Sequence, residues 1–273
     1  MKKPYQPFQP LLEDAGQQRF ELSAQQQLAS GNLTGIVHSY LQIQTSKATP
    51  YPIIPDGTQA VFINPDGSTI GGAYSRSRDM QIPQPGFYFG IRFYPGALRH
   101  LFSLDLSEIS DQLVDSHFLP CKHFSQLHDE VYRQDSFQHR VKCCEQWILK
   151  HISGAIITSS SNPFDHALDI IYRSFGNIDI ATLAAKVDLS SRHLNRLFKQ
   201  HVGLSTKTFT QIIRIQSACK NLLKHPNNSL RTAIDLGYFD QAHLLNEYKR
   251  RLLLNPHSFS KRFRSDFYNR AAL

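Results

Sequence analysis

The chain has 273 residues, enough for two domains of ordinary size. Hydrophobic residues make up 41% and charged residues 19%, which excludes a disordered chain, and no stretch approaches the roughly 18 apolar residues of a membrane span. The net charge of +8 is unevenly distributed: residues 1–155 carry 13 basic and 14 acidic residues, whereas residues 156–273 carry 17 and 8. This excess in the second part indicates either a polyanion-binding surface or a merely soluble basic one.

Several further classes of protein and site are disfavoured. Pro4, Pro7 and Pro10 follow the first residues without the apolar stretch of a secretory signal, and the four cysteines show no CxxC spacing. The histidines are scattered, and neither a GxSxG motif nor a phosphate-binding loop occurs. We therefore expect a reduced cytoplasmic protein that is not an enzyme, with no metal, no cofactor and no membrane partner.

The first half has the pattern of short β-strands. Segments rich in β-branched and aromatic residues cover 33–43, 60–63, 68–70 and 86–94, and the Asn-Pro-Asp-Gly sequence at 64–67 is a strong turn signal between two of them. Several short strands with Pro and Gly between them predict a small barrel or sandwich.

From about Ala97 the periodicity becomes helical. Cys144, Trp147 and Ile148 lie on one apolar stripe, which is either core or a dimer interface, since periodicity does not separate the two. A Ser-rich stretch before Pro163 is typical of a linker. We expect a β-rich sensor or dimerisation domain over residues 1–157 and a second domain over residues 158–273.

The second domain has the pattern of an all-helical fold. The predicted helices cover 163–175, 180–187, 190–201, 206–224, 229–236, 240–251 and 256–267. Two parts of this domain repeat at an offset of 50 residues. The identities are His193/His243, Leu194/Leu244, Lys199/Lys249, Leu204/Leu254 and Phe209/Phe259.

Each copy consists of a short helix, a tight turn and a second helix with Ser190 or Asp240 at its N-cap. Leu194, Leu197 and Phe198 form the inward stripe of the first copy, so polar residues fall on the opposite face. An ordinary helical hairpin repeat is the alternative, but the fixed offset and the basic charge favour DNA recognition. The expected DNA-contacting residues are Ser191, Arg192, Asn195, Arg196, Lys199, Gln241, Ala242, Leu245, Asn246 and Lys249.

Residues of about 163–267 resemble the DNA-binding domain of the AraC/XylS family of bacterial transcription regulators. The resemblance rests on 183–187, 189–199 and 203–205 in the first copy, and on 233–238, 240–244, 249–251 and 255–256 in the second. It implies two helix-turn-helix subdomains joined by a long helix, here about Thr206–Leu223, whose recognition helices enter successive major-groove segments on one face of promoter DNA. It also implies an activator that meets RNA polymerase.

Three positions depart from the family pattern. Thr206 stands where proline is usual, Leu253 where glycine is usual, and Asn246 where arginine is common. We therefore expect an altered closing turn at Leu253. We also expect more base discrimination from the first unit, because Ala242 and Leu245 occupy recognition positions of the second.

The first half resembles, more weakly, the β-barrel sensor domains attached to this family, through 55–57, 90–93 and 95–97. This resemblance implies a cupin-like barrel followed by dimerising helices, and an overall α+β class. Arg92 lies in an aromatic strand, where it either binds an anionic ligand or pairs with a core carboxylate such as Asp56.

The expected function is sequence-specific regulation of transcription, controlled by a small effector or by homodimerisation. Two alternatives are an architectural or constitutive DNA-binding protein without ligand control, and a nucleic-acid-modifying enzyme. Base-reading side chains on one helix face argue against the first alternative, since phosphate contacts alone suffice for positioning. The missing catalytic motifs argue against the second.

Overall fold

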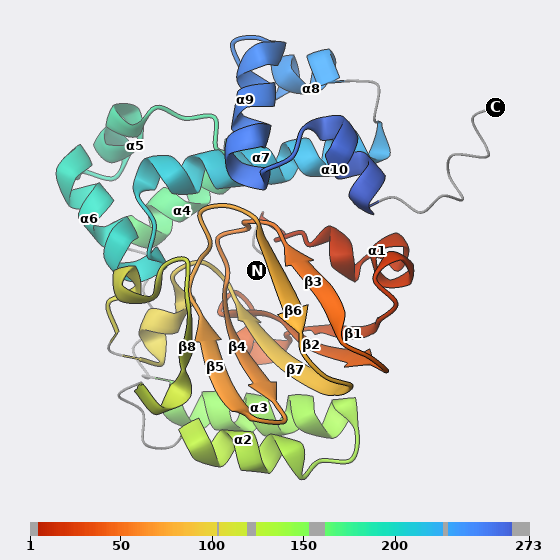
Figure 1. The fold of residues 1–273 in the computed structure, drawn as a ribbon. Coiled ribbons are helices and arrows are strands. Elements are labelled where there is room, and N and C mark those ends of the chain that lie inside the picture. The colour runs from red at the N-terminus through yellow and green to blue at the C-terminus, as the bar shows by residue number, and fades with distance from the viewer. Residues whose placement is uncertain (1–4, 103, 119–123, 153–161, 226–228, 264–273) are drawn as a thin grey trace.

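The computed structural model describes residues 5–102, 104–118, 124–152, 162–225 and 229–263. Within these ranges the first part of the chain forms a β-sheet domain, and the second part forms a helical domain that packs against one end of it (Figure 1). The α+β class is therefore confirmed. The boundary expected between residues 157 and 158 lies outside the described residues.

The β-sheet domain contains a six-stranded antiparallel sheet in the order β1-β2-β7-β4-β5-β8 and a separate two-stranded ribbon, β3-β6. The strands are β1 Ser23–Leu28, β2 Val37–Thr45, β3 Thr49–Ile53, β4 Gln59–Asn64, β5 Gly67–Gly71, β6 Arg78–Ile82, β7 Gly86–Phe93 and β8 Leu113–Asp115. The ribbon lies over one face of the larger sheet and gives the domain its open, barrel-like form (Figure 1).

Local sequence explains two features of this arrangement. The predicted turn at 64–67 joins β4 to β5, and Asn64 pairs with Gly67. Pro50 and Pro52 stand two residues apart in β3, so their backbone nitrogens lie on the same edge of that strand. Because proline has no N–H, that edge lacks these two hydrogen-bond donors. This accounts for the pairing of β3 with β6 alone.

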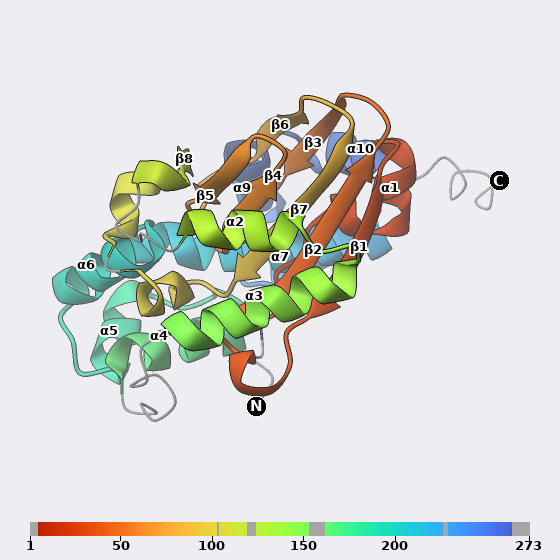
Figure 2. The same cartoon turned by 90° about the horizontal axis from the view of Figure 1, so that it is seen from below.

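Helices α2 (Phe124–Tyr132) and α3 (Phe137–His151) cover the opposite face of the six-stranded sheet, as Figure 2 shows from below. Cys144, Trp147 and Ile148 are all buried there in one cluster with Val61, Phe89 and other sheet residues. The apolar stripe predicted for α3 is therefore core, and these three side chains do not form an exposed dimer surface.

The helical domain consists of seven α-helices in the described ranges, close to the predicted segments. They are α4 Pro163–Arg173, α5 Ile180–Lys186, α6 Ser191–Val202, α7 Thr206–Lys224, α8 Ser229–Asp235, α9 Gln241–Leu252 and α10 Pro256–Phe263. A short helix α1 (Asp14–Arg19) precedes β1, and 3-10 turns cover 10–12, 31–33, 97–100, 106–109 and 116–118.

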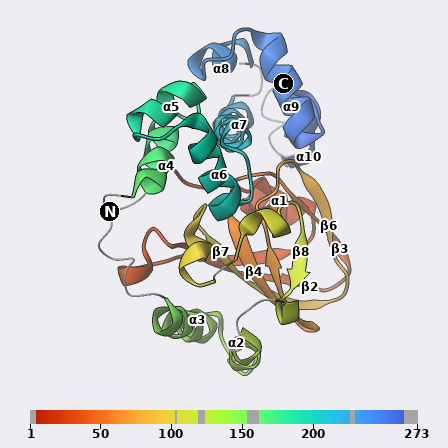
Figure 3. The ribbon, with the colours of Figure 1, turned by 90° about the vertical axis from the view of Figure 1, so that its left-hand side faces the viewer.

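The helical domain has two hydrophobic cores, one around the N-terminal half of α7 and one around its C-terminal half. The first core includes Tyr5 and Ala73 of the β-sheet domain, and the second includes Ile54. Seen from the side in Figure 3, α2 and α3, the sheets, and the helical domain form three successive layers. The two domains are thus packed together through shared apolar contacts.

Candidate nucleic-acid interface

The first helix-turn-helix unit consists of α5 and α6. The Ser190 side chain accepts a hydrogen bond from the His193 N–H (3.2 Å), as an N-cap should, and Gly203 ends α6 in the left-handed conformation with φ 88°. Leu194, Phe198 and Val202 are buried on the inward face. The predicted stripe and cap are both observed, so α6 presents its polar face outward.

The second unit consists of α8 and α9 and repeats this geometry. Asp240 accepts a hydrogen bond from the His243 N–H (2.7 Å), and Leu244, Tyr248 and Leu252 are buried. The expectation of an altered closing turn is wrong, because Leu253 adopts the left-handed conformation with φ 58° and ψ 16°. The non-glycine residue accepts strain there instead of changing the turn.

The structure brings the candidate DNA-contacting residues to two helix surfaces. Nine of the ten are exposed: Ser191, Arg192, Arg196 and Lys199 on α6, and Gln241, Ala242, Leu245, Asn246 and Lys249 on α9. Both helices are held by an N-cap at one end and a left-handed residue at the other. Their exposed polar faces can therefore be offered to a ligand on rigid elements.

Asn195, the tenth candidate, has a structural role that sequence reasoning missed. It is half-buried, and its side-chain oxygen accepts a hydrogen bond from the Thr206 N–H (3.1 Å) at the start of α7. The first N–H groups of a helix have no partner within the helix, so this contact satisfies one of them. The expectation that Asn195 projects freely from the exposed face is therefore wrong.

The two units differ in one residue on the inward side of the second helix. Glu247 of α9 is buried, 3.4 Å from Arg214 of α7, and burial raises the pKa of its carboxyl group while the Arg214 charge opposes that rise. The equivalent position in α6 is the apolar Leu197. Sequence reasoning missed this buried pair, although an acidic residue on an otherwise apolar helix face was the available signal.

Both α6 and α9 are fastened to the β-sheet domain at their C-terminal ends. Gln59, at the start of β4, donates to the Val202 carbonyl (3.1 Å). Arg251 donates to the Ser75 carbonyl (2.9 Å), and its own carbonyl accepts from the Ser77 N–H (2.8 Å). In the 50-residue repeat Val202 corresponds to Leu252, the neighbour of Arg251. The β-sheet domain therefore holds nearly equivalent ends of both helices.

Comparisons with known proteins agree with this geometry. Residues 183–262 match a family described as a helix-turn-helix domain, and residues 25–115 match a domain family of unknown function. An uncharacterised HTH-type transcriptional regulator of Haemophilus influenzae is 32% identical over 82 residues, which are 30% of this chain and 28% of that protein. The HTH-type transcriptional regulator MtrA of Neisseria gonorrhoeae is 33% identical over 85 residues, 31% of this chain and 28% of that protein.

Residues 183–262 therefore form a helix-turn-helix domain similar to those of HTH-type transcriptional regulators. The chain spans 28% of the length of the two curated relatives. Among solved structures, ToxT of Vibrio cholerae O395 aligns with 90% of this chain and 98% of its own, at 10% identity and a TM-score of 0.40.

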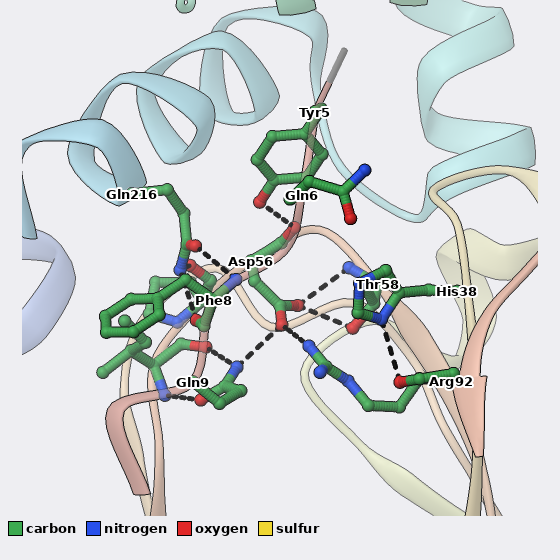
Figure 4. A network of polar contacts seen from close by, with 12 residues as sticks. Tyr5, Gln6, Phe8, Gln9, His38, Asp56, Thr58, Arg92 and Gln216 are labelled. Carbon is green, nitrogen blue, oxygen red and sulfur yellow. Dashed lines mark hydrogen bonds and ion pairs between the residues drawn. The ribbon is translucent and has the colours of Figure 1, made fainter. Parts of the chain in front are cut away.

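A polar network joins the two domains near the middle of α7 (Figure 4). Gln216 accepts from the Phe8 N–H (2.9 Å) and donates to the Pro55 carbonyl (2.9 Å), and it is almost fully buried. The Tyr5 hydroxyl donates to the Asp56 carbonyl (2.8 Å). The signal for Gln216 in the sequence was its place among the apolar residues of α7.

Arg92 lies in this network and contacts Asp56, the carboxylate named as its alternative partner. The Arg92 Nη2 and Asp56 Oδ2 atoms are 2.5 Å apart, and both side chains are buried. Gln9 and Thr58 also donate to the Asp56 carboxylate, at 2.8 Å and 2.6 Å (Figure 4). Arg92 therefore has a complete ionic partner within the protein.

Two findings bear on other classes of site. In the described ranges, no group of three or more His, Cys, Asp or Glu side chains is placed to hold a metal ion. The described helices include none that combines the length and the apolar character needed to cross a bilayer.

Proposed function

We propose that this chain is a sequence-specific DNA-binding regulator of transcription. The observation that carries the proposal is the pair of equivalent helices, α6 and α9, each with the same kind of N-cap and left-handed end and each exposing polar side chains. A helix of this kind places its N-terminal residues against base edges in the major groove. The net +9 of residues 156–273 supports the proposal, since neutralised phosphates supply much of the affinity for DNA.

The connection between the two units supports a contact with two groove segments. The connecting helix α7 has 19 residues, which corresponds to about 28 Å of helix at 1.5 Å per residue. This is close to the spacing of about 34 Å between successive major-groove segments on one DNA face. We propose that α6 contributes more discrimination than α9, because Arg192 and Arg196 can read guanine whereas Ala242 and Leu245 cannot form hydrogen bonds through their side chains.

Selection of bound sequences from a random DNA pool tests this function. The full chain should enrich one site of two half-sites about one helical turn apart, and should bind it at least 1,000-fold more tightly than random DNA. Affinity for both should fall steeply with salt. Equal affinity for selected and random DNA would favour the architectural alternative, and no affinity at low salt would contradict DNA binding altogether.

The finer proposal is that the chain activates transcription by meeting RNA polymerase at the promoter, under the control of a small ligand or of dimerisation through the first domain. Its support is the resemblance to the AraC/XylS family. Transcription in vitro from a template carrying the selected site distinguishes the signs of regulation. More transcript on addition of the protein supports an activator, and less transcript contradicts one.

A further inference from the structure

A cavity lies inside the β-sheet domain, between the β3–β6 ribbon and the six-stranded sheet. Its volume is about 190 Å³. Most of its lining is aliphatic or aromatic: Leu41, Ile43, Tyr51, Ile53, Phe62, Tyr74, Met80, Ile82, Pro83, Tyr88, Phe89 and Leu113. An apolar cavity of about 150 Å³ holds benzene, so this one has room for a single ring with a short substituent.

A smaller space of about 50 Å³ adjoins the cavity on the side of Asp56 and Arg92. The two spaces share six lining residues, among them Tyr51, Phe62 and Gly90. Asp66 and Gln81 are exposed members of the main lining, so they mark the end that faces solvent. A ligand would therefore enter there and point its far end toward the Asp56–Arg92 pair.

The charges around the two spaces disfavour an anionic ligand. Arg92 is the one cationic residue that lines either space in the described residues, and its guanidinium contacts the Asp56 carboxylate. The pair carries no net charge, so a ligand carboxylate would be desolvated without a free cation to compensate. Asp66 at the solvent end would repel it further.

Two tyrosines in the lining, Tyr51 and Tyr74, line both spaces, and neither hydroxyl takes part in a hydrogen bond among the described residues. Tyr51 is the one that lies near the Asp56 and Arg92 charges, toward which the far end of the ligand points, whereas Tyr74 lies near Arg78 and Asp111. Burial raises the pKa of Tyr51 to about 12, against the opposing effect of the Arg92 charge, so the hydroxyl stays protonated at neutral pH. The Tyr88 hydroxyl, by contrast, already donates to the Gln84 carbonyl (2.9 Å).

We propose that this cavity binds an uncharged, largely apolar molecule of the size of one substituted ring, with a single hydroxyl or carbonyl group that bonds to Tyr51. Of the two alternatives for Arg92, this proposal adopts the pairing with Asp56 in place of an anionic ligand. The aromatic and aliphatic walls supply most of the affinity by removing apolar surface from water. The single polar contact orients the molecule.

The lining also leads to the loops that hold the helix-turn-helix units, a consequence that rests on the proposed function. Pro55 and Asp56 precede Gln59, which bonds to α6, and Tyr74 precedes Ser75, which accepts from Arg251 of α9. A ligand that shifts these segments changes how both helices are held. It can alter the affinity for DNA only if it binds the DNA-binding arrangement of the two helices more tightly, or less tightly, than the other arrangement.

Three small probes of one scaffold test the ligand class on the full chain at pH 7.5. We expect 4-propylphenol to raise the Tm by several degrees in a saturable manner, and propylbenzene to do so more weakly. The anionic 4-propylbenzoate should leave the Tm unchanged at the same concentration. Stabilisation by the benzoate equal to that by the phenol, or no stabilisation by the phenol, would overturn the proposal.

Substitutions locate the binding. A Cβ at Gly90 meets nothing closer than Phe62 at 3.7 Å, so alanine fits there without a clash, and the two further methyl groups of Gly90→Val should occupy cavity volume and abolish the effect of the phenol. Gly90→Ala, the matched control, should retain most of it. Tyr51→Phe should weaken the phenol 5- to 10-fold and leave propylbenzene unchanged. Equal weakening of both probes would contradict the hydrogen bond to Tyr51.

A DNA-binding assay with and without the phenol separates the ligand site from its coupling. A changed affinity for the selected site supports both the site and the coupling. Saturable binding of the phenol with an unchanged DNA affinity supports the site and overturns the coupling. Binding of the phenol by a chain that selects no DNA sequence would leave the site standing while the proposed function fails.

Discussion

The side-chain oxygen of Asn195 accepts a hydrogen bond of 3.1 Å from the backbone N–H of Thr206. In the second unit the equivalent positions, 50 residues later, are Leu245 and Pro256. Proline has no N–H to satisfy, so no acceptor is required of residue 245. Thr206, which stands where proline is usual, therefore brings an N–H that needs an acceptor at the start of α7, and Asn195 supplies that acceptor.

This relationship predicts a non-additive pair of substitutions. Thr206→Pro should cost about 1 kcal/mol alone, because proline removes the N–H from which the Asn195 oxygen accepts, although Ser205 is already extended (φ −66°, ψ 152°) and the backbone therefore accommodates proline. Asn195→Ala should cost about 1 kcal/mol alone and much less beside Thr206→Pro. Urea unfolding of all four chains measures the coupling, and strict additivity would contradict it.

The closing turn of α9 predicts a stabilising substitution. Leu253 is left-handed and 58% exposed, so Leu253→Gly relieves strain and loses little buried surface. The free energy of unfolding should rise by about 0.5–1 kcal/mol, after the greater freedom of glycine in the unfolded chain is subtracted. Leu253→Ala is the control: it retains the Cβ that causes the strain and should not stabilise. A similar gain from alanine would mean that the leucine side chain, not the backbone, is at fault.

The exposed face of α6 predicts a division between base reading and anchoring. Arg196→Ala should cost about 1–3 kcal/mol at the selected site and relax preference at one base position, because arginine can bond to guanine through two donors. Lys199→Ala should weaken selected and random DNA alike and reduce the salt slope by about one. Titrations of both DNAs at several salt concentrations distinguish these outcomes. If Arg196→Ala weakens both DNAs equally, Arg196 contacts phosphate.

The Asp56–Arg92 pair predicts a structural role for Arg92. Arg92→Ala leaves the Asp56 carboxylate buried beside Gln9 and Thr58 without its cation, and should destabilise the chain by about 3–5 kcal/mol. Adding Asp56→Asn to Arg92→Ala should recover part of that loss, because no unpaired charge remains. Urea unfolding measures both. Wild-type stability of Arg92→Ala would instead leave Arg92 available to an anionic ligand.

His38 predicts a pH dependence of stability. Burial, aided by the Arg92 charge and opposed by Asp56, lowers the pKa of His38 to about 3. Between pH 6.5 and 3 the unfolded chain therefore binds a proton that the folded chain does not, so the free energy of unfolding falls as pH falls, by up to about 1.4 kcal/mol per unit. His38→Gln should remove this part of the slope. Unfolding at pH 7.5 and 5.5 measures it, and parallel losses in both chains would contradict the assignment.

Local patterns in the sequence determined most of the helical domain. The caps Ser190 and Asp240, the apolar stripes and the repeat at 50 residues all act over a few residues, so they place α5, α6, α8 and α9 without knowledge of the rest of the fold. The strands around the turn at 64–67 followed from the same kind of signal. These short-range preferences also made both helix-turn-helix units recognisable, and with them the outward face of each second helix.

Tertiary structure decided which of those exposed positions are free to act and which side chains pair. Asp56 and Arg92 are 36 positions apart, and Phe8 and Gln216 are 208 apart, so only the folded chain brings them together. Asn195 has an ordinary place on the helix surface until α7 approaches it. Whether a polar group binds a ligand or a neighbour depends on long-range contacts that the periodicity of one segment does not encode.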